Sequence, residues 1–192
     1  MKDPAKEVAR VVRRVFRVMR LQYAGGKEKF GDWIGRLAKE LVEPLAAAVL
    51  GGLRRGLPRG ADRALHHQLG QDGAAAAKIR AMESARSILQ TTNDWIEEGR
   101  DERQVFGVDR SVMIGLTEAK WAEGMGITLG AKAGKGRVRW VNDPKPCASC
   151  KKLAGKIVKA GTVFTVHDGV AVYHPPLHPS CRCFVEVVQS IR

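Results

Sequence analysis

The first part of the chain alternates apolar and charged residues with the period of an α-helix. Apolar side chains recur every three or four positions over residues 8–19, and the positions between them hold Arg10, Arg13, Arg14, Arg17 and Arg20. This spacing puts the apolar side chains on one face of a helix and the arginines on the other. The basic face is either the solvated side of a core-packed helix or a docking element for nucleic acid, a partner groove or an anionic membrane.

A second apolar stripe predicts a helix that begins near Asp32 and ends at the glycines that follow residue 50. Pro44 lies inside this pattern and is expected to kink or break the helix, because proline lacks the backbone N–H and crowds the preceding turn. Residues 57–73 are rich in glycine and are predicted to form a loop. His66 and His67 are assigned to surface or helix-end roles rather than to a metal site, because no other candidate ligand surrounds them.

Two more helices are predicted in the middle of the chain, as a helical hairpin over residues 74–130. The first covers residues 74–98 and is ended by Gly99, and Asp109 is the candidate N-cap of the second. The following run from Gly130 to Gly136 lacks the ordered spacing of a phosphate-binding loop, so we interpret it as a linker. The boundary between two parts of the chain therefore falls near residue 135.

The C-terminal part alternates apolar and polar residues in short runs that are typical of strands. These runs cover residues 138–141, 162–166, 170–173 and 184–188, and Asp168-Gly169 is a candidate hairpin turn. The sequence thus predicts an α+β protein. A mostly helical body over residues 1–135, with basic amphipathic helices over residues 1–56, precedes a small β-rich module over residues 136–192.

All four cysteines lie in this module, in two close pairs. Cys147 and Cys150 can present both thiolates from one turn, at the spacing of a tetrahedral zinc site. Cys181 and Cys183 lie two positions apart before a predicted strand, so their side chains are expected to share a face. We predict a structural Zn²⁺ rather than a disulfide, because the N-terminal residues show no signal for an oxidising compartment.

The candidate metal ligands are Cys147, Cys150, His178, Cys181 and Cys183. Four thiolates are the favoured set, and the alternative is Cys147, Cys150, His178 and Cys181. A zinc ion with four protein ligands has no open position for water, so the site is predicted to be structural. The cysteine pair also matches half of the nucleobase deaminase signature, but no histidine here is followed two residues later by glutamate.

The chain carries a net charge of +13, and the excess of basic residues is concentrated in residues 1–60 and 141–192. This distribution favours a polyanion or an acidic protein surface as partner. Candidate contact residues are the five arginines of the first helix together with Lys151 and Lys152 beside the metal pair. No membrane partner is expected, because the longest apolar run is about half of the roughly twenty residues that a bilayer requires.

Several residues together resemble a known family. In the module they are Trp140, Asp143, Cys147-x-x-Cys150, Leu153, Gly155 and Pro175-Pro176-x-His178-Pro179-x-Cys181-Arg182-Cys183. This string resembles the C-terminal signature of the Mu F-like phage minor head proteins, a head morphogenesis family. Upstream, Ile114-x-x-Thr117-Glu118 followed by Gly124 is similar to the Thr-Glu helix that precedes that signature, and the resemblance covers residues 109–187.

The resemblance implies a virion structural protein and no enzyme. Such a protein is present in a few copies beside the portal inside the capsid, after assembly in the host cytoplasm, and acts in head assembly, genome packaging or delivery with the DNA. Two alternatives remain: a zinc-stabilised protein that binds nucleic acid without sequence preference, and an effector or toxin-associated module. The basic charge supports the first, and the second lacks a nucleophile and base at recognisable spacing.

Overall fold

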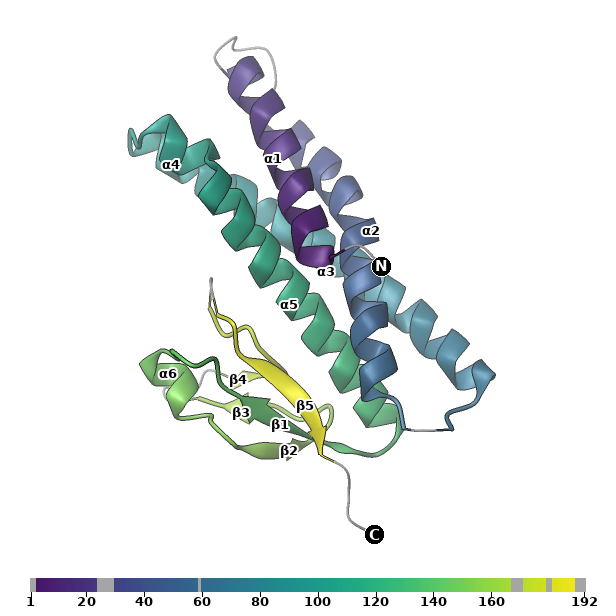
Figure 1. Cartoon of the computed structure of the whole chain (residues 1–192). Coiled ribbons are helices and arrows are strands. Elements are labelled where there is room, and N and C mark those ends of the chain that lie inside the picture. Colours follow the sequence, from purple (N-terminus) through teal and green to yellow (C-terminus); the bar gives the residue numbers. More distant parts are fainter. Residues whose placement is uncertain (1–2, 24–29, 59, 167–170, 179–180, 189–192) are drawn as a thin grey trace.

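A helical body and a small β module make up the computed structural model (Figure 1). The structure describes residues 3–23, 30–58, 60–166, 171–178 and 181–188. The body contains α1 (Pro4–Tyr23), α2 (Phe30–Gly56), α3 (Arg63–Glu97), α4 (Glu102–Phe106) and α5 (Val108–Ala133). The module contains β1 (Arg137–Val141), α6 (Ala148–Lys151), β2 (Ile157–Lys159), β3 (Phe164–Thr165), β4 (Ala171–Val172) and β5 (Phe184–Val188). The predicted α+β class is confirmed.

The apolar stripe of α1 forms part of the core of the body. Val8, Val12 and Phe16 are fully buried, and they share one cluster with Leu37 and Leu41 of α2. The arginines of α1 lie on its exposed face, as the helical period predicted. None of the described helices is long and apolar enough to cross a membrane.

The glycines of α2 and α5 bring the two helix backbones into direct contact. A Cβ at Gly52 would lie 2.1 Å from the carbonyl oxygen of Glu123, and one at Gly126 would lie 2.0 Å from that of Val49. Gly56 and Gly130 meet the facing backbone in the same way. The predicted linker after residue 130 is therefore wrong over its first half, because α5 continues to Ala133 and its glycines serve packing rather than chain reversal.

Two other helix boundaries differ from the prediction, and the chain does not break at Pro44. Helix α3 begins at Arg63 rather than residue 74, with Asp62 as its N-cap, so most of the predicted loop is helical and His66 and His67 lie exposed on this helix. Pro44 does not end α2, which continues to Gly56. Helix α5 is capped by Gly107 and not by Asp109.

The module is built on antiparallel strands. The order β2-β1-β5 forms one sheet, and β3 pairs with β4 in a second. Strand β2 was not predicted, and the predicted Asp168-Gly169 turn lies outside the described residues. Trp140 packs edge-to-face on Phe164, with ring centroids 5.3 Å apart, in a core that Ile127 and Ala131 of α5 complete. The helix α5 thus belongs to both cores.

Candidate metal centre

The first cysteine pair lies on a short helical turn. Cys147 is the N-cap of α6, and its Sγ accepts a hydrogen bond of 3.4 Å from the backbone N–H of Cys150. Cys147 is exposed, whereas Cys150 is buried in the core of the module. The turn therefore aims both sulfur atoms in one direction, as the two-residue spacing predicted.

The remaining candidate ligands come from the chain that returns after β4. The backbone N–H of Cys181 donates a hydrogen bond of 3.1 Å to the carbonyl oxygen of His178. Cys181 and Cys183 are both buried just before β5. Because β5 pairs with β1 in antiparallel register, the return segment is brought back alongside the turn that carries the first pair.

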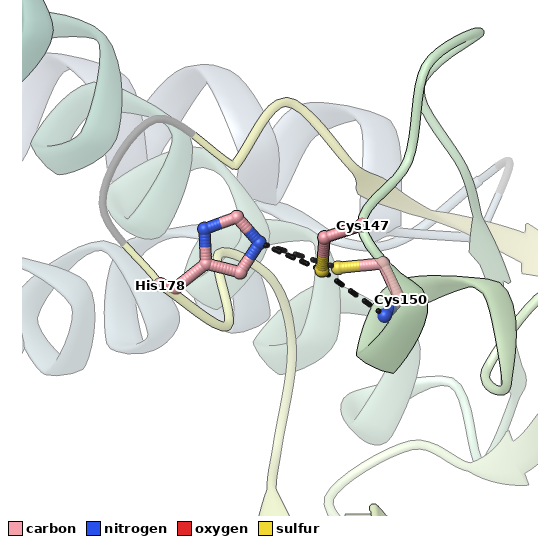
Figure 2. A group of neighbouring side chains, drawn as sticks. All are labelled: Cys147, Cys150 and His178. Atoms are coloured by element: carbon pink, nitrogen blue, oxygen red, sulfur yellow. Dashed lines mark hydrogen bonds between the residues drawn. The ribbon is translucent and has the colours of Figure 1, made fainter.

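The structure brings all five candidate ligands into two overlapping groups of three. Figure 2 shows the first group, in which His178 points toward the sulfur atoms of Cys147 and Cys150. The Nε2 atom of His178 lies 3.1 Å from Cys147 Sγ and 3.7 Å from Cys150 Sγ. Cys150 Sγ also lies 3.7 Å from Cys181 Sγ. The ligand atoms of Cys147, Cys150 and His178 lie within 4.8 Å of one another, and so do those of Cys150, Cys181 and Cys183.

These distances can be compared with those of a tetrahedral metal site. Bond lengths of about 2.3 Å to sulfur and 2.0–2.1 Å to nitrogen separate two sulfur ligands by about 3.8 Å and a sulfur from a nitrogen by about 3.6 Å. Both contacts of Cys150 fit these values, and the Cys147–His178 contact is shorter. The cluster could therefore hold a metal ion.

Hydrogen bonding and burial act differently on the thiols. The N–H of Cys150 lowers the pKa of Cys147 to about 7, with a further contribution from His178. Burial raises the pKa of Cys150 and that of Cys183. Buried thiols with raised pKa values lose their protons only when a cation compensates the charge, so metal binding here must release protons.

Cys183 has a second partner that the sequence did not indicate. Its thiol lies 3.8 Å from Oδ1 of Asn142, in a geometry in which the thiol donates. The same oxygen accepts a hydrogen bond of 3.1 Å from Nε1 of Trp140. Asn142 thus ties Cys183 to the core of the module rather than to the group that contains His178.

A buried polar network holds the return segment against α5. Glu118 accepts hydrogen bonds from Arg80 Nε at 2.8 Å and from Ser84 Oγ at 2.5 Å. The Arg80 guanidinium lies over the Trp121 ring, 4.7 Å from its centroid, and Trp121 contacts His174 at 5.2 Å between centroids. This network holds His174 in place, four residues before the candidate ligand His178.

His174 is a buried polar position beside the cluster that sequence reasoning missed. Its side chain is buried, and burial lowers its pKa to about 4, so the imidazole is neutral at physiological pH. A Cβ at Gly124 would lie 2.8 Å from its Nδ1, so this glycine leaves the space that the ring occupies. The sequence signal that could have indicated a close contact here was Gly124, which lies on the same helix face as Trp121.

The predicted basic contact residues are exposed but lie in two separate places. Lys151 and Lys152 lie at the end of α6, beside the cysteine cluster. On α1, Arg10 pairs with Glu7, Arg14 with Glu40, and Arg20 with Glu102. Within the described residues, Arg13 and Arg17 have no ion-pair partner.

Comparison of the chain with protein-family models, with curated proteins and with solved structures gave no match. Any function assigned to the chain therefore depends on its own residues and on the geometry described above.

Proposed function

We propose that the chain is a minor structural protein of a phage head, located beside the portal inside the capsid, where it acts in head assembly, genome packaging or delivery. One observation carries the proposal. The two cysteine-bearing segments that resemble the Mu F-like signature converge on one site, and the helix with the resembling Thr117-Glu118 pair packs against the same module.

In this arrangement the residues that carry the resemblance are connected through contacts in the fold. Glu118 organises Arg80 and Ser84, Arg80 lies over Trp121, and Trp121 contacts the segment that leads to His178. Residues that are distant in the sequence therefore act on one module. This organisation supports a structural role, because the polar groups are engaged with one another in the fold.

We further propose that the site holds one structural Zn²⁺, with Cys147, Cys150, His178 and Cys181 as ligands. The soft thiols and the imidazole are the donors that zinc prefers. His178 lies at ligand spacing from two thiols, whereas Cys183 is engaged by Asn142. Zinc would supply folding free energy to a module whose short strands bury little surface by themselves.

Native mass spectrometry of protein purified under reducing conditions tests the zinc proposal. We expect one zinc per chain in the wild type and none in Cys150→Ser. The matched control is Ser149→Ala on the same turn, which is exposed and should retain the metal. A wild-type protein without metal, or a disulfide at Cys147 in the cell, would refute the proposal.

Assembled particles test the head-protein proposal. The tagged chain is produced together with the portal and capsid proteins of the same genome, and DNA-filled particles are purified and cross-linked. We expect substoichiometric copies inside the particle, with cross-links to portal protein. Particles that lack the chain, while the chain remains free in the lysate, would exclude this role.

A second candidate function is electrostatic, sequence-independent binding of nucleic acid. It is favoured by Arg13 and Arg17, which are exposed one helical turn apart and unpaired within the described part of the chain. The three neighbouring arginines already pair with glutamates. The surface available to phosphate groups is therefore smaller than five arginines would suggest.

A further inference from the structure

Strand β5 is the outer strand of its sheet. The order β2-β1-β5 pairs one edge of β5 with β1, and no other described strand pairs with the opposite edge. Figure 1 shows β5 on the side of the sheet nearest α5. The unpaired edge of an outer strand presents backbone N–H and C=O groups that can pair with an added strand.

That edge borders a groove of about 1110 Å³. All five residues of β5, from Phe184 to Val188, line it. Successive residues of a strand point to opposite faces of the sheet, so a groove lined by every residue in turn faces the backbone edge rather than one face. The opposite wall consists of the C-terminal end of α2 and part of α5.

The opposite wall combines an apolar surface with excess positive charge. Its apolar part includes Leu57, which is half-buried, and Pro58, which is exposed. Its carboxylate, Glu123, is shared by Arg55 at 2.5 Å and Lys120 at 2.9 Å.

The other charged residues along the groove also leave an excess of positive charge. Glu186 of β5 is already paired with Arg139 of the neighbouring strand. Arg54 lines the groove, is exposed, and has no ion-pair partner among the described residues. The acidic groups of the groove are therefore compensated while a basic group remains available.

We propose that the free edge of β5 is a docking site for an extended, acidic and apolar peptide segment of a partner protein, which adds to the sheet as a further strand. Backbone hydrogen bonds to β5 supply affinity, and the apolar and basic wall selects the side chains. This inference is independent of the metal and of the head-protein proposal.

A second copy of the same chain fits this edge poorly. A two-fold antiparallel pairing of β5 with its own copy centres on Glu186, so the two Glu186 side chains would lie directly opposite each other. Like charges in directly opposed positions destabilise a strand pair. The pairing would also bring together two chains that each carry a net charge of +13.

Fluorescence anisotropy with the full-length chain tests the proposal. The probe is a short, end-blocked peptide of alternating glutamate and valine that carries a fluorescent label. We expect saturable binding, weaker binding of the peptide with lysine in place of glutamate, and loss of binding when alternate backbone nitrogens of the probe are methylated. Equal binding of the lysine peptide overturns the charge selection, and equal binding of the methylated peptide overturns strand addition.

Matched variants locate the binding surface. Arg54→Gln should weaken binding about two- to five-fold, the range expected for one exposed ion pair. Arg86→Gln is the control, because Arg86 is exposed on α3 and does not line the groove. Equal effects of the two substitutions overturn the assignment to this groove. Self-association that the glutamate peptide blocks overturns the choice of a different protein as partner.

Discussion

Two adjacent glycines of α2 should respond to alanine in opposite directions. Gly51 and Gly52 lie in the same helix with ordinary helical backbone. A Cβ at Gly51 meets no atom within 4 Å, whereas a Cβ at Gly52 would lie 2.1 Å from the Glu123 carbonyl oxygen and 3.0 Å from the Ile127 nitrogen. Comparing the two alanine substitutions therefore separates the effect of the contact between α2 and α5 from the effect of helix propensity.

The magnitudes follow from these distances. Gly51→Ala should stabilise the protein by about 0.5–1 kcal/mol, because alanine loses less backbone entropy than glycine in a helix. Gly52→Ala gains the same propensity, but ordinary contact begins near 3.4 Å, so the two backbones must separate by more than a full ångström. Overpacking of this kind costs about 1–3 kcal/mol, and more where rigid backbone must move.

Urea unfolding of the full-length protein, followed by far-UV circular dichroism, measures both changes. We expect the unfolding midpoint to rise for Gly51→Ala and to fall for Gly52→Ala, with unchanged slope. If Gly52→Ala were as stable as Gly51→Ala, the close approach of α2 and α5 would be wrong, and so would the explanation of the glycine-rich stretches as packing surfaces.

Three further predictions concern the site, the buried histidine and the basic face. His178→Ala should lower zinc affinity by at least ten-fold in a chelator competition assay, whereas Cys183→Ser should retain the metal; the reverse order would favour four thiolate ligands. Burial lowers the pKa of His174 to about 4. The neutral imidazole therefore contributes up to about 3 kcal/mol to the free energy of unfolding above pH 6.5, and this contribution is lost as the pH falls through 4. NMR titration of the imidazole measures the pKa, and a midpoint near 6.5 would contradict the burial of the side chain. Binding to duplex DNA should weaken steeply with salt, and Arg13→Gln with Arg17→Gln should reduce the salt slope by about 2; unchanged binding would remove α1 as the contact surface.

The sequence was most informative where one local pattern determines one structure. The period of apolar residues in α1 placed Val8, Val12 and Phe16 in the core, because burial of an apolar stripe is the main source of helix stability in proteins. The spacing of Cys147 and Cys150 identified the turn of α6, because two thiols with two residues between them can face one ion.

Local reasoning failed where tertiary contacts override propensity. Pro44 lies between the fully buried Leu41 and Leu45, and the packing of these residues keeps α2 continuous despite a local cost of about 3 kcal/mol. The glycines near residue 130 were assigned to a linker, because glycine more often marks a turn than a helix contact. The readable signal was their spacing, since Gly126 and Gly130 lie four residues apart, as do Gly52 and Gly56.

Helix α5 has a consequence for how the chain can be divided. The main chain turns at Gly134 and Gly136, which suggests a cut near residue 135. Yet Ile127 and Ala131, on the body side of that turn, belong to the core around Trp140. A fragment that begins at Gly136 would leave this core open on one side, and a body fragment that ends there would expose the same two side chains to water. The smallest exchangeable unit is therefore the β module together with α5. A protein that acquires the module by recombination must also supply a helix that can pack against the glycines of α5, as α2 does here.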